Sequence, residues 1–387
     1  MRKISVIGLG YVGLPTFVAL SNVKKNQSYV YEVHGIEKNN KRGNYIKQCF
    51  RNKKNWINSS DKNFLKNIKN SFNRSNVFLR TDFKKINESD VIIVSINFEL
   101  KSKSNKIFSN LKKLSESLAK NIKKKALIIF ESTLPPGTSE RIIIPIFNNT
   151  LKKRNLKMND IYFSYSFERV MPGENYMKSI TDNYRCYSGI NKESKEKFKN
   201  LLKTFINFKK YKLCELENIT ECEATKILEN SYRAINISLI DEWTKISGLL
   251  KINLFNMINA IKLRKTHSNI MRPGIGVGGY CLTKDPLFIK YSLKKLYNKK
   301  FPFPIISKAM QVNSAMVNTS FNYLKAKLKV IKNKKILICG LAYKADTSDL
   351  RSSSSIELIK ILKKNGALIT ALDPYIEVKM KEFGNIK

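Results

Sequence analysis

The sequence predicts an α/β fold in three parts: a large parallel-sheet domain, a central domain built on a long helix, and a shorter second α/β domain. Three observations predict this architecture. A β-branched run ends in a glycine-rich turn within the first twenty residues, helical spacing continues for more than thirty residues from about 218, and a strand–loop–helix–strand pattern begins near 330. We expect the three domains to span residues 1–210, 211–310 and 311–387.

The composition is that of a globular protein with an excess of basic residues. The chain has 387 residues, of which 42% are hydrophobic, which is enough for two or three domains with their own cores. Lys and Arg number 72 against 30 Asp and Glu, a formal net charge of +42. These basic residues are spread along the chain without aromatic interleaving or zinc-finger spacing, so we expect no nucleic-acid partner. A positive surface could still attract a phosphorylated small molecule.

The N-terminal run resembles a signal peptide only superficially. Gly8, Gly10, Gly13 and Pro15 interrupt it, and no small-residue cleavage site follows. No later stretch is long and apolar enough for a membrane span. The six cysteines show neither metal-ligand spacing nor a disulfide pattern; they are Cys49, Cys186, Cys214, Cys222, Cys281 and Cys339. We therefore expect a cytoplasmic protein with no membrane insertion and no metal.

The first strand and turn carry a dinucleotide-binding pattern. ISVIGLG ends in Gly8-x-Gly10-x-x-Gly13, and helical spacing follows. In a Rossmann domain these glycines allow the tight turn, the approach of a pyrophosphate and close helix–strand packing, while backbone N–H groups hold the phosphates. A second strand places Glu37 where an acid binds the adenosine ribose hydroxyls, which favours NAD over NADP. Lys38 and Arg42 lie close enough to weaken that preference.

Three further apolar runs are typical of strands buried on both faces of a parallel sheet. They span residues 90–96, 126–133 and 161–168. Ligands of such sheets bind at the carboxyl ends of the strands. Thr133 and Glu168, which end the second and third of these runs, are therefore expected to face a site.

The central and C-terminal parts of the sequence each contribute polar residues to the predicted site. Residues 218–250 predict one long helix or two in series, with Lys226 and Asn230 on one face. After 330 the pattern predicts a second βα unit, whose helix begins in the serine run 352–355. Lys344 and Arg351 flank its strand–helix loop, which is again the ligand end of an α/β unit.

Six segments, in this order, resemble the UDP-glucose/GDP-mannose dehydrogenase family of NAD-dependent nucleotide-sugar 6-dehydrogenases. They are GLGYVGLP, ESTLPPGT, SYSFERVMPG, EATKILENSYRAIN, GVGGYCLTKDP and GLAYKADTSDLR. The resemblance covers nearly the whole chain. ERVMPG is closer to the branch that oxidises UDP-N-acetylhexosamines, whereas the KDP after the cysteine is more similar to UDP-glucose enzymes.

The resemblance implies that an alcohol is oxidised to an acid with two NAD, the second oxidation acting on an intermediate held by a thiolate. Cys281 would attack the aldehyde to give a thiohemiacetal, whose oxidation gives a thioester that water cleaves. The glycines before Cys281 would let its loop lie flat against the substrate. Lys284 would favour the thiolate.

The other catalytic roles follow from the matched motifs. Lys226 and Asn230 would stabilise the alkoxide or oxyanion, and Lys226 or a water that it holds would accept the first proton. Asp285 would position or activate a water. Glu168 would assist thioester hydrolysis with a water bound near Thr133.

The resemblance also implies the binding residues and a homodimer. The expected cofactor-binding residues are Gly8, Gly10, Tyr11, Val12, Gly13, Glu37, Ser95, Thr133, Lys284 and Arg351. The expected substrate-binding residues are Glu168, Arg169, Lys226, Asn230, Arg272, Gly278 and Lys344. A neighbouring subunit would supply a basic residue to the site, and Arg264, Lys265, His267 and Arg272 are all candidates.

Three departures from the family pattern bear on this reading. VSINFEL replaces a proline-containing strand end, Phe167 replaces the proline expected before Glu168, and the sequence ends soon after LDPY. We therefore expect a truncated C-terminal nucleotide-sugar-binding domain with an open sheet edge.

The favoured function is oxidation of UDP-N-acetylglucosamine or UDP-N-acetylmannosamine to its uronic acid for cell-surface polysaccharide. UDP-glucose 6-dehydrogenation is one alternative. A two-electron β-hydroxyacid-type dehydrogenase, which also carries Lys-x-x-x-Asn but needs no thiol, is a second. An inactive truncated binding protein is the third.

Overall fold

The computed structural model describes residues 1–57, 59–98 and 108–376, and the chain divides into two compact units. Unit 1 comprises Met1–Lys226 with Lys294–Asn298, and unit 2 comprises Ile227–Leu293 with Lys299–Lys387. The predicted three-part α/β class is confirmed, whereas the predicted limits at 210 and 310 stay predictions. Residues 377–387 of the predicted third domain lie outside the described residues.

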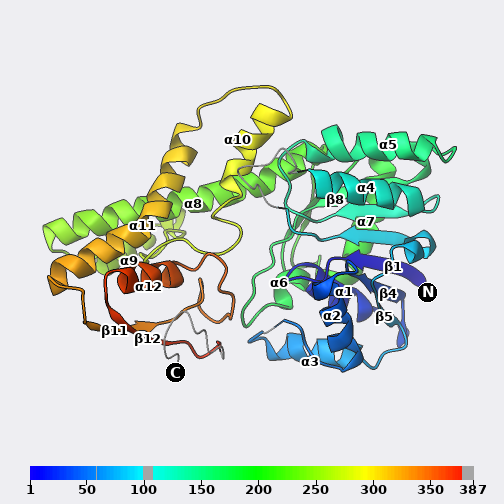
Figure 1. Ribbon diagram of the computed structural model, residues 1–387. Helices are drawn as coiled ribbons and strands as arrows, with labels where there is room; N and C mark the ends of the chain where they lie inside the picture. Colours follow the sequence, from blue (N-terminus) through cyan, green and yellow to red (C-terminus); the bar gives the residue numbers. More distant parts are fainter. Residues whose placement is uncertain (58, 99–107, 377–387) are drawn as a thin grey trace. The chain divides into compact units, whose positions relative to one another are not determined.

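Unit 1 contains an eight-stranded sheet (Figure 1) in the order β10-β9-β8-β7-β6-β1-β4-β5. The strands are β1 (Arg2–Ile7), β4 (Tyr31–Ile36), β5 (Val77–Arg80), β6 (Val91–Val94), β7 (Leu127–Phe130), β8 (Tyr162–Ser166), β9 (Arg185–Gly189) and β10 (Leu213–Glu215). Strand order reverses between β1 and β6, so the carboxyl ends of these two strands flank the crevice in which such sheets bind ligands.

The predicted apolar runs form the middle of this sheet. All residues of β6, β7 and β8 are buried, as their continuous apolar patterns indicate. The sequence did not reveal β9 and β10. β9 pairs antiparallel with β8, and its sequence RCYSG has neither a long apolar run nor strict alternation. It is held in the sheet by its pairing rather than by its own pattern.

Helices cover both faces of the unit 1 sheet. They are α1 (Gly13–Ser21), α2 (Lys41–Arg51), α3 (Lys62–Ser71), α4 (Ser109–Asn121), α5 (Ile144–Lys152), α6 (Lys178–Thr181) and α7 (Lys192–Phe205), with a small hairpin of β2 (Lys24–Lys25) and β3 (Ser28–Tyr29). α1 packs against α3, α6 and α7, and α4 packs against α5 (Figure 1). Every residue of α1 is buried, so the glycine-rich turn is fixed by the core beneath it.

Unit 2 consists of long helices and a small parallel sheet. Its elements are most of α8 (Ile219–Leu250), then α9 (Leu254–Lys262), α10 (Pro286–Lys295), α11 (Pro304–Leu328), β11 (Lys335–Cys339), α12 (Ser354–Lys364) and β12 (Leu368–Leu372). The predicted long helix is thus one element. α12 starts in the predicted serine run, where the Ser353 side chain accepts a hydrogen bond from Ile356 N. β11 and β12 pair in parallel, which gives the predicted βα unit.

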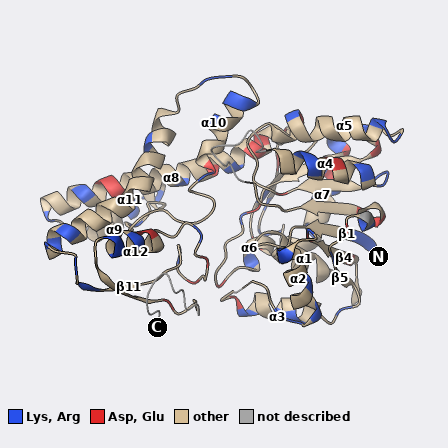
Figure 2. Ribbon diagram, in the orientation of Figure 1, with Lys and Arg blue, Asp and Glu red and all other residues tan. Residues whose placement is uncertain are grey.

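Basic residues are distributed over both units. Figure 2 shows Lys and Arg on helices throughout the chain, with fewer Asp and Glu among them. The expected absence of a nucleic-acid partner stays a prediction. Within the described ranges, no helix combines the length and apolarity needed to cross a membrane.

Replacing Gly13 with Ala is expected to destabilise unit 1. A Cβ at Gly13 would lie 1.9 Å from the Gly8 carbonyl oxygen and 3.2 Å from Ser95 Cβ, so the buried turn must shift. Overpacking of this kind costs about 1–3 kcal/mol, measurable as a lower urea midpoint. Gly248→Ala is the matched control, because nothing lies within 4 Å of its Cβ in α8. We expect it to be neutral or to stabilise by about 0.5–1 kcal/mol, and equal losses in both variants would contradict the packing argument.

Candidate active site

The glycine-rich turn lies against the end of β6. Gly8 has a φ of +89°, and a Cβ there would be 2.7 Å from the Ser95 carbonyl oxygen. Only glycine fits this position, because both the backbone conformation and the space exclude a side chain. No side chain caps α1 at Val12, so this end of the helix presents backbone N–H groups at the carboxyl edge of the sheet.

Two side chains complete the surroundings of the turn. Glu37, which follows β4, accepts a hydrogen bond from Leu9 N at 2.6 Å. The Arg42 guanidinium lies 3.9 Å from the position that a Cβ on Gly10 would take. The residues fit a dinucleotide, since glycine leaves room at Gly10, an arginine and N–H groups face phosphates, and a carboxylate suits ribose hydroxyls. In the sequence analysis, Arg42 was considered only as a residue that could weaken the preference for NAD over NADP.

A buried ion pair, missed from the sequence, lies at the same edge. Glu131 follows β7 and is only 2% exposed, and its carboxylate is 3.5 Å from the guanidinium of Arg185 on β9. Ser95 Oγ donates to the same carboxylate at 3.1 Å. Burial raises the pKa of Glu131, while Arg185 and the hydrogen bond from Ser95 oppose that rise. Arg185 also donates to the Phe167 carbonyl at 3.2 Å, and so ties β9 to the turn after β8.

Glu168 and Lys226 come together in that turn. The Lys226 ammonium donates to the Glu168 backbone carbonyl at 2.8 Å and lies 4.0 Å from its carboxylate, and both side chains are buried. Val170 N donates to the Glu168 carboxylate, which fixes the carboxylate's orientation. Thr133 is half-buried in the loop after β7. The side chain of the adjacent Arg169 donates at 2.8 Å to the carbonyl of Tyr184, the residue just before β9.

A second buried carboxylate, Glu223, anchors the start of α8. It accepts hydrogen bonds from Gly137 N at 2.6 Å, Ser139 N at 2.9 Å and Ser139 Oγ at 2.7 Å. Burial raises the pKa of Glu223 to about 8, and the bonds from Ser139 and Gly137 limit the rise. The loop LPPGT is thereby fixed to the helix that carries Lys226. Glu223 belongs to the EATK motif, but nothing in the sequence indicated its partner.

In unit 2, the predicted nucleophile lies in a tight turn. Cys281 is exposed, and its carbonyl accepts hydrogen bonds from Lys284 N at 3.1 Å and Asp285 N at 2.9 Å. Asp285 is fully buried, with one carboxylate oxygen 2.8 Å from the Asn230 amide nitrogen and the other 2.7 Å from the Lys284 ammonium. The structure thus brings together three of the predicted residues, Asn230, Lys284 and Asp285, around the turn of Cys281.

The glycines before Cys281 have a packing role within unit 2. A Cβ on Gly278 would lie 2.6 Å from Tyr343 Cβ and 2.7 Å from the Ser352 carbonyl, and one on Gly279 would meet the Tyr343 ring. Gly279 N donates to the Arg351 carbonyl at 3.0 Å. The loop therefore lies flat against the C-terminal segment. Its expected contact with substrate stays a prediction.

The C-terminal basic residues differ in their surroundings. Arg351 pairs with Asp349 at 2.6 Å, and its guanidinium lies 5.2 Å from the centre of the Tyr280 ring. Lys344 is exposed, but partial desolvation lowers its pKa, with a further decrease from the charge of Arg233 on α8 and an opposing effect of Asp346. A bound anion would relieve the repulsion between these two like charges. Arg272 is exposed.

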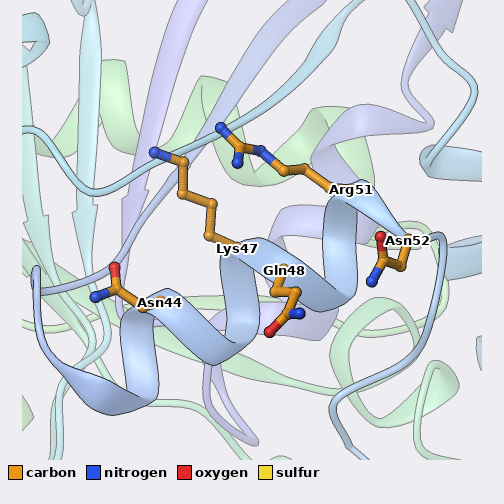
Figure 3. A pocket seen from close by; sticks show the side chains of 5 residues that line it. All are labelled: Asn44, Lys47, Gln48, Arg51 and Asn52. Carbon is orange, nitrogen blue, oxygen red and sulfur yellow. The ribbon is translucent and has the colours of Figure 1, made fainter.

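A surface pocket on α2 lies apart from these residues. It has a volume of about 460 Å³ and is lined only by Asn44, Lys47, Gln48, Arg51 and Asn52, which belong to α2 and its C-terminal end (Figure 3). None of them was a predicted site residue. Across the described residues, no group of three or more His, Cys, Asp or Glu side chains is arranged to hold a metal ion.

Comparisons with known proteins cover both units. Three models of the UDP-glucose/GDP-mannose dehydrogenase family match: its NAD binding domain at residues 2–206, its central domain at 220–315 and its UDP binding domain at 337–386. The chain is 34% identical to the UDP-N-acetyl-D-mannosamine dehydrogenase of Methanococcus maripaludis, over 97% of this chain and 80% of that protein.

Two further similarities agree with these matches. The UDP-N-acetyl-D-glucosamine 6-dehydrogenase of Pseudomonas aeruginosa is 28% identical over 99% of this chain and 85% of its own length. The solved structure of the UDP-D-ManNAc dehydrogenase from Pyrococcus horikoshii aligns with a TM-score of 0.81 at 26% identity, covering 99% of this chain and 86% of that one.

Replacing Arg185 with Met is expected to destabilise the protein by about 3–5 kcal/mol, because it leaves the Glu131 carboxylate buried without its partner. Folding then favours the protonated acid, so the folded-state pKa of Glu131 exceeds its unfolded value and stability falls as pH rises above that value. Urea unfolding should therefore show a larger loss at about pH 8 than at about pH 5. The double variant Glu131→Gln, Arg185→Met should show little of this pH dependence. A loss independent of pH in Arg185→Met would contradict the argument.

Proposed function

The chain belongs to the UDP-glucose/GDP-mannose dehydrogenase family, and we propose that it oxidises the 6-hydroxyl of a UDP-N-acetylhexosamine to the uronic acid through a covalent intermediate on Cys281. The observation that carries this proposal is the turn of Cys281, where the buried Asp285 carboxylate is hydrogen-bonded to Asn230. A simple alcohol dehydrogenation needs no such thiol. The names of the relatives support an N-acetylhexosamine, and UDP-N-acetylmannosamine in particular.

The first oxidation requires a proton acceptor and stabilisation of the alkoxide. NAD, held at the glycine-rich turn, would supply the hydride acceptor for both oxidations. Lys226 as a neutral amine, or a water bound to its ammonium, accepts the hydroxyl proton, and in either case the ammonium that is then present stabilises negative charge on the oxygen. The Glu168 carbonyl and carboxylate hold that ammonium in place. The product of this step is an aldehyde.

The second oxidation requires the thiol. The Cys281 sulfur adds to the aldehyde carbon, the carbonyl oxygen takes up a proton, and a thiohemiacetal results. Loss of a hydride and a proton from that adduct leaves a thioester. Asn230 donates to the developing oxyanion, a role for which its amide is already oriented by Asp285.

Hydrolysis returns the enzyme to its starting state. A water adds to the thioester carbonyl, the carbon–sulfur bond breaks, and the Cys281 sulfur is released with the carboxylate product. Asp285, assisted by Glu168 and Thr133, positions or deprotonates that water. Arg169, Arg272, Gly278 and Lys344 are assigned to the nucleotide sugar. Arg233 joins Lys344 as a second cation for its phosphates.

The stoichiometry of NADH separates this proposal from its alternatives. We expect two NADH for each UDP-N-acetylmannosamine consumed, a smaller rate with UDP-glucose, and no uronic acid from Cys281→Ser, because the thioester cannot form. The measurement is absorbance of NADH at limiting sugar. Cys339→Ser, which removes another exposed cysteine, is the control and should behave as the wild type.

Other outcomes would identify the alternatives. One NADH for each sugar with an unaffected Cys281→Ser would indicate a two-electron β-hydroxyacid-type dehydrogenase. A folded protein that binds NAD without turnover of any UDP-sugar would indicate an inactive binding protein. A preference for UDP-glucose would indicate that the protein is a UDP-glucose 6-dehydrogenase. The cytoplasmic location stays a prediction.

We further propose that α8 forms a homodimer interface with a second copy of the chain. Six large apolar side chains are exposed along it, and five of them recur at intervals of four or seven residues, which places these five on one face of the helix. They are Leu228, Tyr232, Leu239, Ile246 and Leu250, and all belong to unit 2. A continuous apolar stripe of this length favours burial against a matching stripe.

Ile246→Glu is expected to convert a dimer to a monomer, because it places a charge within the apolar stripe. The measurement is light scattering coupled to size-exclusion chromatography. Thr244→Glu changes an exposed residue on another face of α8 and should leave the dimer intact. A wild-type monomer, or equal effects of the two substitutions, would contradict the proposed interface.

A further inference from the structure

Three cysteines that were unrelated in the sequence gather in unit 1. Cys186 lies on β9, Cys214 on β10 and Cys222 near the start of α8. The parallel register of β9 and β10 pairs Cys214 directly with Cys186, so the two side chains lie on the same face of the sheet. Cys214 is exposed, whereas the other two are buried.

We propose that Cys186 and Cys214 form a reversible disulfide, so that this pair is an oxidative modification site in unit 1. Neighbouring strands lie about 4.8 Å apart, within the range of about 4.4–6.8 Å between Cα atoms that a disulfide requires. β10 has only three residues and is the terminal strand of the sheet, so it can adjust to the bond. A bond between such closely constrained strands is readily reduced again.

The pair differs from the third cysteine because one of its members, Cys214, is exposed. Cys222 has no exposed surface, and its sulfur lies 3.9 Å from the Tyr165 carbonyl in the core. Burial raises its pKa well above the ordinary value, which keeps it a thiol. Burial also raises the pKa of Cys186, but the Arg169 guanidinium, 3.9 Å from its sulfur, opposes this rise. Cys214 is the member of the pair that an oxidant in solution reaches first.

With a peroxide as the oxidant, the reaction balances in two steps. The Cys214 sulfur attacks one peroxide oxygen, the oxygen–oxygen bond breaks, and a sulfenic acid and one water form. The Cys186 sulfur then attacks the Cys214 sulfur, the sulfur–oxygen bond breaks, and a second water leaves with the proton of Cys186. Two thiols are oxidised and the peroxide is reduced. A dithiol reverses the change by exchange.

The disulfide would act on the turn that carries Glu168. Arg169 is held by the carbonyl of Tyr184, just before β9, and by the sulfur of Cys186 on β9. Drawing that sulfur toward β10 removes one of these contacts from a residue assigned to the nucleotide sugar. This consequence rests on the proposed function. Loss of one hydrogen bond of average strength corresponds to roughly threefold to tenfold weaker binding of the sugar.

The modification itself is tested without any activity measurement. The full chain is treated with hydrogen peroxide, free thiols are blocked by alkylation, and peptides are analysed by mass spectrometry. We expect a linked pair of peptides containing Cys186 and Cys214, which dithiothreitol separates. Cys214→Ser should abolish this link. Cys339→Ser is the matched control and should retain it, because exposed Cys339 pairs with Leu372 in its sheet. Oxidation of Cys214 with Cys186 still alkylated as a free thiol would overturn the proposal.

The effect on binding is tested in the Cys281→Ser background, which removes the other reactive thiol of the proposed mechanism. Calorimetry with UDP-N-acetylmannosamine should give a Kd about threefold to tenfold higher after cross-linking. The double variant Cys214→Ser, Cys281→Ser should show no change after the same treatment. A cross-linked protein with an unchanged Kd would overturn the coupling to Arg169. Failure of the reduced protein to bind any UDP-sugar would instead count against the proposed function.

Discussion

In unit 1, the position of the loop after β7 relative to the start of α8 depends on one buried carboxylate that joins them. Glu223 collects three hydrogen bonds from the loop after β7, and these fix the start of α8. Lys226 follows one turn later on the same helix, so the contact also determines where its ammonium meets Glu168. Gly137 is part of this junction, with a φ of +86° and the Tyr297 hydroxyl 2.4 Å from where a Cβ would lie. A side chain at Gly137 would separate the loop from the segment that packs on it.

Unit 2 uses its buried acid in a comparable way. Both carboxylate oxygens of Asp285 are engaged, one by Asn230 and the other by Lys284, which leaves the side chain a single orientation. The turn between Cys281 and Asp285 is closed by backbone hydrogen bonds, while the glycines before it are pressed against Tyr343. The thiol is therefore presented by a rigid backbone. Such preorganisation would suit the nucleophilic role proposed for Cys281.

The sequence predicted the features that are encoded locally. The strands around the glycine-rich turn, the long helix and the helix start in the serine run each have a continuous pattern, and the structure confirms them. The ion pair of Glu131 with Arg185 joins residues 54 positions apart, and Glu223 meets its loop across more than 80, so no local pattern indicates either contact. The pairing of Cys186 with Cys214 depends on β9 and β10, two strands that the sequence did not reveal. The roles of the predicted site residues stay predictions.

The excess of basic residues acts differently from the charged residues of the candidate site. Four of the cations discussed above have an acidic partner, namely Lys226 with Glu168, Arg185 with Glu131, Lys284 with Asp285 and Arg351 with Asp349. The carboxylate is buried in each of these pairs, so salt screens them less than it screens surface charges, and they fix the local geometry. The surplus that gives the chain its net charge of +42 produces a surface field that attracts anions and decays within a Debye length of about 8 Å at physiological ionic strength. Ionic strength is therefore expected to change this attraction of anions, while the geometry of the four ion pairs is maintained.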